Sequence, residues 1–263
     1  MEFQEYVNSY TLDSTTNNYI HKHFTEATEA NDFLFKHRSF VEQNKLGFGD
    51  RAFHFMWYLL LLELFRTRNS PKLLEIGVYK GQVISLWKLI AKRMNQECDI
   101  SCITPLSGNP APRNKIIYWF KYLTSNKFRA ASNAGNFYAS ENYLDIIKSL
   151  FEQFDLEFKL NLCNGLSNNP AILSKFEHID FDLIYIDGDH SREAVEEDIV
   201  NFAPKVKVGG FLVMDDASCN IPGGENNEYW KGHQSVSDAC EIIPTLGFVN
   251  VLNVGHNRLY QKI

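Results

Sequence analysis

Cysteine is scarce in this sequence, and no arrangement gives it a special role. The 263 residues include five cysteines, an odd number, and no two of them stand in C-x-x-C spacing. This argues against a disulfide framework, a zinc knuckle and a redox pair. The first residues lack the basic start and apolar run of a signal peptide, and the most apolar stretch, residues 52–65, is too short to span a bilayer. We therefore expect a cytoplasmic protein with reduced thiols, in which 52–65 is a buried helix.

Positive charge is also in short supply. The sequence has 26 Lys and Arg against 32 Asp and Glu, a formal net charge of −6. Nucleic acid and anionic lipid are disfavoured as partners, because both select clustered positive charge. With 44% hydrophobic and 22% charged residues, the composition is globular and excludes disorder, collagen-like repeats and a coiled coil. The expected partners are small molecules or proteins, and the sequence leaves a homo-oligomer open.

From residue 72 onward, short apolar runs alternate with longer amphipathic segments, which predicts βα units in a parallel sheet. The predicted strands are 72–76, 99–103, 157–163, 181–186 and 210–214, and the predicted helices are 81–93, 191–202 and 235–243. The last part of the chain differs, because 248–254 and 258–262 flank a Gly-His-Asn turn and predict a hairpin. The fold class is therefore α/β: a mostly parallel, seven-stranded sheet with an antiparallel C-terminal hairpin. By analogy at the level of the fold, this is the Rossmann-like arrangement of class I methyltransferases.

Two regions fall outside the repeat. Residues 1–70 are rich in aromatic residues and predict a helical N-terminal cap on a domain formed by 71–263. Residues 105–155 are longer than an ordinary connection and predict an insertion. Both regions are candidate lids. Within the insertion, four large apolar residues recur at helical spacing, which favours a helix packed on the core. These residues are Ile116, Trp119, Phe120 and Leu123.

A glycine-bearing turn follows the first predicted strand. Glycines at such a turn let the backbone approach a ligand, and the N–H groups of the following helix point at that ligand. The dinucleotide fingerprint needs a glycine where Tyr79 stands, so NAD is disfavoured. The spacing of Glu75, Gly77 and Gly81 instead resembles the S-adenosylmethionine turn of class I methyltransferases. The alternative is a turn that binds nothing.

This resemblance implies a set of cofactor contacts. Glu75, Gly77, Tyr79 and Gly81 would line the cofactor, with Tyr79 over its methionine part. Class I methyltransferases usually hold the ribose with an acid at the end of the second strand, and here that position is Thr104, which offers a single hydroxyl. The residues expected to contact the adenine or ribose after the next predicted strand are Asn164, Gly165 and Ser167. The departure at Thr104 leaves open a non-catalytic binding protein with a decayed cofactor pocket.

Acids follow two of the predicted strands. Asp187, Asp189 and His190 come after one strand, and Asp215 and Asp216 after the next. The carboxyl ends of parallel strands open onto one cleft, so these acids should converge. Two unit charges ~4 Å apart repel by about 4 kcal/mol at an effective dielectric of 20, so the cluster requires raised pKa values or a cation. Oxygen ligands favour Mg²⁺ or another hard divalent cation. Any one aspartate alone could instead cap a helix.

The stretch from Asp187 to Asp216, with the glycine turn, resembles the metal-dependent sugar O-methyltransferases of antibiotic biosynthesis, namely the macrocin, mycinamicin and aminocoumarin enzymes. That family takes one metal ligand from a D-G-D segment and two from an acid pair 28 and 29 residues later, which is the spacing found here. The resemblance implies that Asp187, Asp215 and Asp216 are metal ligands, with Asp187 also beside the cofactor. It implies Asp189 or His190 as the catalytic base and does not choose between them.

Together these patterns predict an S-adenosylmethionine-dependent, divalent-metal-dependent O-methyltransferase. Its acceptor would be a hydroxyl of a sugar or small natural product, and a catechol-like phenol is an alternative because it also chelates a metal through paired oxygens. The metal would lower the pKa of the acceptor hydroxyl, and Asp189 or His190 would take the proton. The loop after the acid pair, which carries Tyr229, Trp230 and His233, would form a substrate wall or a solvent loop.

Overall fold

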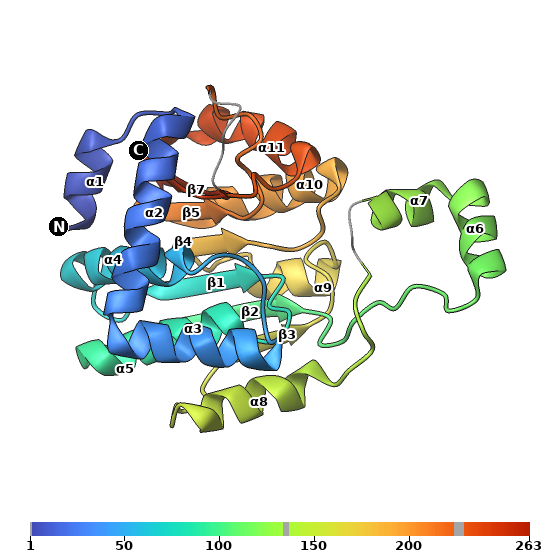
Figure 1. The fold of residues 1–263 in the computed structure, drawn as a ribbon, viewed down its shortest axis with the longest axis horizontal. Helices are drawn as coiled ribbons and strands as arrows, with labels where there is room; N and C mark the ends of the chain where they lie inside the picture. The colour runs from blue at the N-terminus through green and yellow to red at the C-terminus, as the bar shows by residue number, and fades with distance from the viewer. Residues whose placement is uncertain (1, 134–136, 224–228) are drawn as a thin grey trace.

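A seven-stranded sheet forms the centre of the computed structural model, which describes residues 2–133, 137–223 and 229–263 (Figure 1). The strands are β1 (Lys72–Ile76), β2 (Asp99–Thr104), β3 (Asn161–Asn164), β4 (Phe181–Ile186), β5 (Val206–Met214), β6 (Phe248–Val254) and β7 (Asn257–Lys262). Their order is β3-β2-β1-β4-β5-β7-β6. The first five in this order pair in parallel, whereas β7 is antiparallel to β5 and to β6. The predicted fold class is confirmed.

Three strand predictions have the right bounds, and two fail at the start of the strand. Strands β1, β4 and β6 have the predicted bounds, and β4 is buried along its whole length. Strand β3 begins at Asn161 and not at 157, because its pairing with β2 starts there. Strand β5 begins at Val206 and not at 210. Its pairing with β4 shifts register between Phe181 and Leu183, so the two glycines at 209 and 210 form an irregularity within the strand instead of preceding it.

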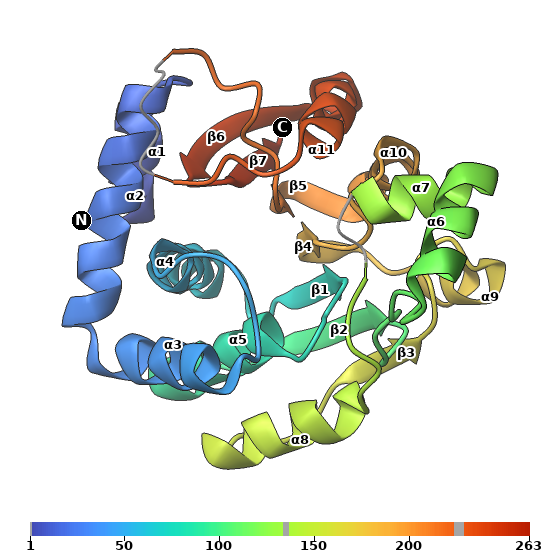
Figure 2. The ribbon, with the colours of Figure 1, turned by 45° about the vertical axis from the view of Figure 1, so that its right-hand side comes forward.

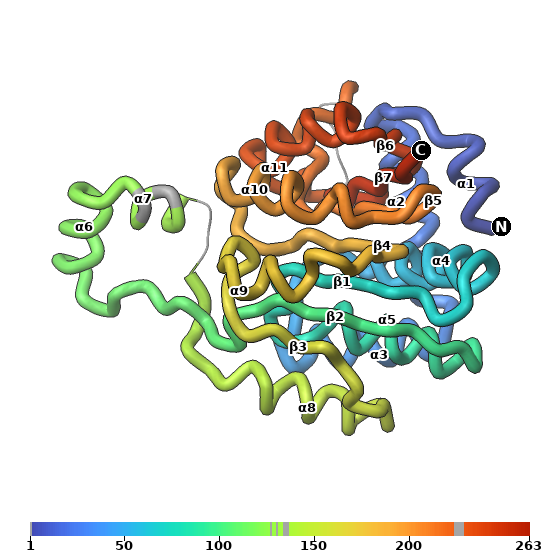
Figure 3. The backbone as a smooth tube through the Cα atoms, turned by 180° about the vertical axis from the view of Figure 1, so that it is seen from behind, coloured from blue at the N-terminus to red at the C-terminus, as the bar shows by residue number. Residues whose placement is uncertain are grey.

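Helices cover both faces of the sheet (Figures 2 and 3). They are α1 (Phe3–Ser9), α2 (Ser14–Ala30), α3 (Asp32–Asn44), α4 (Ala52–Thr67), α5 (Gln82–Met94), α6 (Lys115–Thr124), α7 (Asn126–Asn133), α8 (Tyr143–Gln153), α9 (Pro170–Leu173), α10 (Arg192–Phe202) and α11 (Gln234–Ala239). One core lies between the sheet and α1, α2, α3, α4, α5 and α8, and a second lies between the opposite face and α9, α10 and α11. No described helix is both long and apolar enough to cross a membrane.

Two predicted helices are realised with informative differences. The apolar stretch 52–65 is buried as α4, where Trp57 packs edge-on against Trp87 and Tyr185. The predicted helix 235–243 is α11 continued by a 3₁₀ segment, Cys240–Leu246, that contains Pro244. In an α-helix the Pro244 ring would clash with the carbonyl group of Cys240, four residues earlier, and the 3₁₀ segment begins at that residue. The division of the chain near residue 70 stays a prediction.

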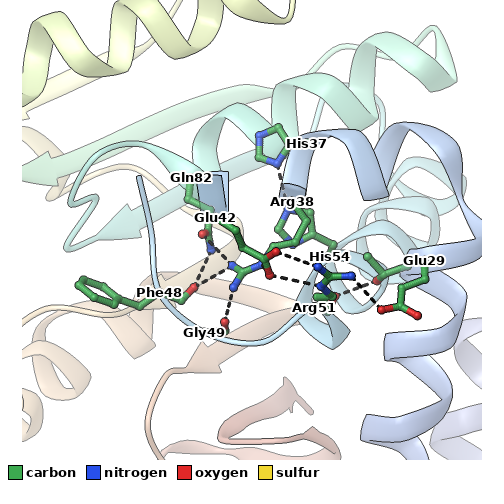
Figure 4. Close-up of polar contacts among 10 residues, drawn as sticks. Glu29, His37, Arg38, Glu42, Phe48, Gly49, Arg51, His54 and Gln82 are labelled. Atoms are coloured by element: carbon green, nitrogen blue, oxygen red, sulfur yellow. Dashed lines mark hydrogen bonds and ion pairs between the residues drawn. The ribbon is translucent and has the colours of Figure 1, made fainter. Parts of the chain in front are cut away.

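An ionic network fixes the loop between α3 and α4 (Figure 4). Arg38 donates to the Glu42 carboxylate at 2.8 Å and to the Phe48 carbonyl oxygen at 3.1 Å. Arg51 joins the same Glu42 and also Glu29, each at 2.9 Å. Because Arg38 is buried and holds carbonyl oxygens of the loop, the position of Phe48 is set by this network and not by the loop alone.

A buried histidine pair lies beside the network (Figure 4). His37 Nδ1 is 2.9 Å from His54 Nε2, and His37 Nε2 is 3.0 Å from the Ser85 hydroxyl. Burial, with the nearby Arg38 charge, lowers the pKa of His37 to about 3, and it also lowers that of His54 well below the usual range. The pair is therefore neutral and belongs to the core.

The pair of helices α6 and α7 projects from the body of the molecule as an arm (Figures 1 and 3). The prediction that the apolar face of α6 packs on the core is wrong: the side chains of Trp119, Phe120 and Leu123 are 57%, 67% and 69% exposed. The opposite face of α6 makes the contact with α7, where the Tyr118 ring packs 5.3 Å from that of Phe128. Helical spacing reports that a face is apolar but does not report what that face contacts.

This exposure predicts a difference between two phenylalanine truncations. Phe120→Ala should change the free energy of unfolding by no more than about 0.5 kcal/mol, as for an exposed site. Phe151→Ala, at a fully buried position of α8, should cost about 3–5 kcal/mol because it leaves a cavity. Urea unfolding of the two variants measures both values. Comparable losses would show that the arm folds against the body in solution.

Candidate active site at the carboxyl ends of the central strands

The ends of β1, β4 and β5 are held in register by backbone hydrogen bonds. Asp187 N donates to Ile76 O at 2.8 Å, and Asp215 N donates to Ile186 O at 3.1 Å. The ladder therefore continues one residue past each strand, and the two aspartates come side by side at the same edge of the sheet. A small pocket opens there between the ends of β4 and β5, and its lining includes both aspartates and His190.

Asp216 is turned by a left-handed backbone conformation, with φ of 53°. Two hydrogen bonds hold this turn: Ala217 N donates to His256 O at 2.8 Å, and His233 N donates to Asp216 O at 2.9 Å. Gly232 packs so closely that a Cβ there would lie 2.2 Å from the Asp216 carbonyl. The hairpin turn and the loop before α11 thus clamp Asp216 from both sides, and its buried side chain faces the same space as Asp215.

Three histidines surround the acid pair. His256 Nε2 lies 3.5 Å from Asp215 Oδ1 and 3.6 Å from Asp216 Oδ1. On the other side, His190 Nε2 and His233 Nε2 lie 3.4 Å and 3.8 Å from Asp216 Oδ2, and the two imidazole rings are stacked 4.5 Å apart. Among the described residues these side chains form two trios in which the potential ligand atoms all lie within 4.8 Å of one another. Both trios include Asp216.

Crowding and burial change the acidity of the cluster. Burial, with the Asp215 charge, raises the pKa of Asp216 to about 9. Burial and the charges of Asp215 and Asp216 raise the pKa of Asp187 well above its usual range, and burial with the Asp215 charge does the same for Glu75. Without a cation, the cluster therefore retains protons that ordinary aspartates release near pH 4. A cation would compete directly with those protons.

The glycine turn after β1 packs tightly on its neighbours. Gly77 has φ of 97°, and a Cβ on it would lie 1.8 Å from the Asp187 carbonyl oxygen. Gly81 has φ of 90°, and a Cβ there would lie 2.9 Å from the Ile147 side chain on α8. Both glycines are thus required by the contacts of the turn with the protein itself, as well as by its backbone conformation.

An aromatic cluster surrounds Tyr79 of this turn. The ring of Tyr79, whose φ is 40°, lies 5.2 Å from Phe48, 5.4 Å from Tyr138 and 5.2 Å from Tyr143. Burial raises the pKa of Tyr138 to about 12, and the charges of Asp187, Asp216 and Asp215 add to the rise. The network around Arg38 holds Phe48 in this cluster.

The residues predicted to contact the ribose lie together at the ends of β2 and β3. Thr104 pairs with Asn164, and Gly165 N donates to Thr104 O at 3.0 Å. The buried Thr104 hydroxyl accepts the Leu106 N–H at 3.2 Å, so it already serves a turn. Ser167 contacts Asp198, whose pKa burial raises to about 7, while the hydrogen bond to Ser167 opposes that rise. Asn164 is exposed at this strand end.

The two aromatic residues of the predicted substrate wall differ in orientation. The Tyr229 hydroxyl accepts a hydrogen bond from Asn17 Nδ2 of α2 at 2.6 Å, so this side chain is buried toward the N-terminal helices. The Trp230 ring, 55% exposed, lies 5.2 Å from both His233 and His256. Residues 224–228 of this loop lie outside the described residues.

A comparison with protein families finds a match to a family described as a methyltransferase domain, over residues 74–217. The chain belongs to this methyltransferase family. No curated protein matches the sequence. The strand ends that carry the acids fall within the matched region of this methyltransferase.

Solved structures with a similar fold include two methyltransferases and one further protein. The SAH-bound methyltransferase PaMTH1 of Podospora anserina aligns with a TM-score of 0.56 and 13% identity, over 92% of this chain and 94% of that chain. A protein from Corynebacterium glutamicum gives 0.56 and 16%, over 93% and 95%. The O-methyltransferase NovP gives 0.52 and 15%, over 80% and 78%. At these identities the similarity is one of fold.

The methyltransferase brings most of the predicted acid site together. Asp187 and Asp215 meet at the strand ends, and Asp216 and His190 meet beside them. Asp189 does not join them: it is exposed, and its Oδ1 accepts the Ser191 N–H at 2.7 Å at the start of α10.

Sequence reasoning missed His256, although one signal was present. The predicted hairpin runs antiparallel to β5, with Met214 paired to Arg258. The turn of such a hairpin must lie at the carboxyl end of β5, where the acid pair begins. His256 is the histidine of that turn, so the topology alone places it beside Asp215 and Asp216.

The raised pKa of Asp216 predicts the pH dependence of stability for the metal-free methyltransferase. Because the folded pKa, about 9, exceeds the ordinary value of 3.8 for an aspartate, the folded state binds the extra proton. The contribution of this group is complete below about pH 4 and is lost as the pH rises toward 9. Asp216→Asn removes it, so between pH 5 and pH 9 the unfolding free energy of the variant should fall less steeply than that of the wild type.

Chemical denaturation at pH 5, 7 and 9 in the presence of EDTA measures these slopes. Asp238→Asn is the matched control, because the Asp238 pKa is lowered by Gln234 and Asn220, and the group stays ionised over this range in both states. Its slope should equal that of the wild type. Parallel curves for Asp216→Asn and the wild type would contradict the assignment.

Proposed function

We propose that the protein is an S-adenosylmethionine-dependent O-methyltransferase that requires a divalent cation and methylates a hydroxyl of a sugar or another small polar acceptor. The observation that carries the proposal is the convergence of Asp187, Asp215, Asp216 and His190 at the strand ends next to the glycine turn. Membership of a methyltransferase family supports methyl transfer. The fold shared with the O-methyltransferase NovP supports oxygen as the acceptor atom.

The cofactor would lie across the ends of β1, β2 and β3. Glu75, Gly77 and Gly81 shape the turn beneath it, and Asp187 borders it on the β4 side. Tyr79 presents its ring at this turn within the aromatic cluster. The sulfonium of S-adenosylmethionine is a cation, and an aromatic face stabilises a desolvated cation.

The adenosine end of the cofactor would reach the ends of β2 and β3. Because the Thr104 hydroxyl already serves a turn, the exposed Asn164 amide is the better donor and acceptor for the ribose hydroxyls. Gly165, with φ of 148°, packs against Ile172, whose side chain would lie 2.7 Å from a Cβ there, and Ser167 follows on the same loop. This arrangement replaces the carboxylate that most class I methyltransferases use.

The acid cluster fits a divalent cation. Asp215 Oδ1 is buried and has no hydrogen-bond partner among the described residues, and its neighbours have raised pKa values. Both features are expected of a cluster whose ionised form a bound cation would stabilise. We propose Asp187, Asp215 and Asp216 as ligands, with Mg²⁺ or another hard divalent cation as the ion. When bound, the cation would lower the pKa of an acceptor hydroxyl that coordinates it.

The proton of the acceptor would pass to His190. Its Nε2 faces Asp216 Oδ2 at 3.4 Å within the site, whereas the exposed Asp189 carboxylate accepts the Ser191 N–H just before α10. A neutral imidazole accepts a proton near neutral pH, and a neighbouring carboxylate stabilises the imidazolium that results. The Ser235 hydroxyl, which donates to the His190 carbonyl oxygen, keeps this residue in place. Trp230 and the aromatic cluster would flank the acceptor and exclude water.

Replacing Asp215 tests the metal-assisted step. Asp215→Asn should lower metal-stimulated methyl transfer at least about 100-fold, because an oxyanion-stabilising or metal-holding group is worth this much. It should leave S-adenosylmethionine affinity within about 3-fold, since the cofactor lies on the β1 side. Calorimetry gives the affinity, and transfer of labelled methyl to a sugar and to a catechol acceptor, with and without EDTA, gives the rate.

Asp99→Asn, an exposed position at the opposite end of β2, is the matched control and should behave as the wild type. Persistent metal-stimulated turnover in Asp215→Asn contradicts the ligand assignment. No binding of S-adenosylmethionine at millimolar concentration would instead favour the decayed-pocket alternative. A strong preference for the catechol would mean that the acceptor is a phenol and not a sugar.

Tyr79→Leu tests the aromatic contact with the sulfonium. The variant keeps apolar bulk but removes the ring, so S-adenosylmethionine should bind about 10-fold more weakly. S-adenosylhomocysteine, which has no positive sulfur, should lose less than about 3-fold. Calorimetric titration with both ligands measures the difference, and Tyr122→Leu on α6 is the control. Equal losses for the two ligands would show that Tyr79 acts through packing.

A further inference from the structure

The contacts of His256 are too long for hydrogen bonds but suitable for a shared ion. Its Nε2 lies 3.5 Å from Asp215 Oδ1 and 3.6 Å from Asp216 Oδ1, beyond the usual 2.7–3.2 Å of a hydrogen bond to oxygen. Two ligands that each bind one tetrahedral ion at about 2.0–2.1 Å lie roughly 3.3 Å apart. The three atoms therefore stand close to the spacing of ligands around one metal.

One oxygen of this trio is also unsatisfied. Asp215 Oδ1, the oxygen that faces His256 Nε2, is buried and has no hydrogen-bond partner among the described residues. His256 itself is 3% exposed. Buried polar atoms are nearly always paired in folded proteins, so this oxygen requires an explanation. A cation bound between it and His256 Nε2 supplies one.

The imidazole is fixed in this position before any ion binds. The Phe53 ring packs edge-on against the imidazole at 4.5 Å, and the His256 carbonyl oxygen accepts the Ala217 N–H. Asn17 of α2 grips the preceding residue: Asn17 Nδ2 donates to Gly255 O at 2.9 Å, and Gly255 N donates to Asn17 Oδ1 at 3.0 Å. A ligand held on three sides loses little freedom on coordination.

We propose that His256 is a nitrogen ligand of the ion held by Asp215 and Asp216, and that the site therefore binds Mn²⁺, Fe²⁺, Co²⁺ or Zn²⁺ in preference to Mg²⁺. Magnesium selects oxygen ligands, whereas imidazole suits the transition metals. The inference deepens the proposed function and rests on it only for the presence of a metal. Acids alone predict Mg²⁺, and the added nitrogen ligand changes the expected ion to a transition metal.

His190 and His233 are weaker candidates for this role. Both approach the other oxygen of Asp216, and their side chains are 14% and 27% exposed, against 4% for His256. They are stacked on each other, and His190 is the proposed proton acceptor. The trio with His256 contains the more deeply buried histidine and the unpaired Asp215 oxygen, so it is the stronger chelating position.

Calorimetric titration of the metal-free protein with MnCl₂ and with MgCl₂, without cofactor or acceptor, tests the proposal. The wild type should bind Mn²⁺ at least 10-fold more tightly than Mg²⁺. His256→Gln should weaken Mn²⁺ binding at least 10-fold and Mg²⁺ binding less than 3-fold, because it removes the nitrogen ligand and leaves the carboxylates. His178→Gln, at an exposed position outside the site, is the matched control and should change neither.

Two further readouts separate coordination from damage to the fold. The visible absorption of bound Co²⁺ should change in band position or intensity in His256→Gln, because its ligand set changes. S-adenosylmethionine affinity should not change. Loss of cofactor binding in His256→Gln would mean that the variant is misfolded; His256→Asp, which keeps a ligand and exchanges nitrogen for oxygen, should then bind Mg²⁺ as tightly as Mn²⁺.

The failures are distinguishable. Equal affinity of the wild type for Mn²⁺ and Mg²⁺, or an unchanged Co²⁺ spectrum in His256→Gln, overturns the role of His256 and leaves the proposed function intact. Methyl transfer that persists in a protein shown to be free of metal overturns the metal in the proposed function and this inference together.

Discussion

Mutual repulsion among carboxylates at the ends of two adjacent strands is the constraint on which this site depends. The backbone ladder forces Asp187 and Asp215 together, and a left-handed residue adds Asp216. Folding has to place these groups in a partly dry environment, where their charges are costly. The surroundings answer that cost with imidazoles on both sides of the pair and with raised pKa values. A bound cation would relieve the repulsion among these carboxylates, and this relief would favour its binding.

The fold could be predicted from the sequence where local pattern and tertiary environment agree. Strand β4 is apolar at nearly every position because both of its faces are covered, and the hairpin carries its own turn. The errors lie where pairing with a neighbouring strand, and not the local sequence pattern, determines where a strand begins. Strand β3 starts only where β2 offers partners, and β5 continues through a glycine irregularity. The apolar face of α6 was misassigned because periodicity contains no information about the partner of a face.

The same distinction applies to the site. The acids could be found because the carboxyl ends of parallel strands lie at the same edge of a sheet, so the order of strands and acids in the sequence was sufficient. The sequence could not tell which of Asp189 and His190 lies beside Asp216, since neighbours in sequence diverge when one of them bonds the backbone before a helix. Phe48 and Tyr138 come from loops without any motif, and their position depends on buried contacts made elsewhere, such as those of Arg38.

Asn17 joins α2 to both Tyr229 and the residue before His256, across more than two hundred positions of sequence. The N-terminal helices are thus not an independent module set on top of a finished active centre. In evolution, a change in how α2 lies on the sheet would shift the His256 imidazole together with Tyr229. Under the proposed function, the acceptor range and the preferred ion would then change together, so exchanging the first helices between two related proteins would transfer both properties or impair both.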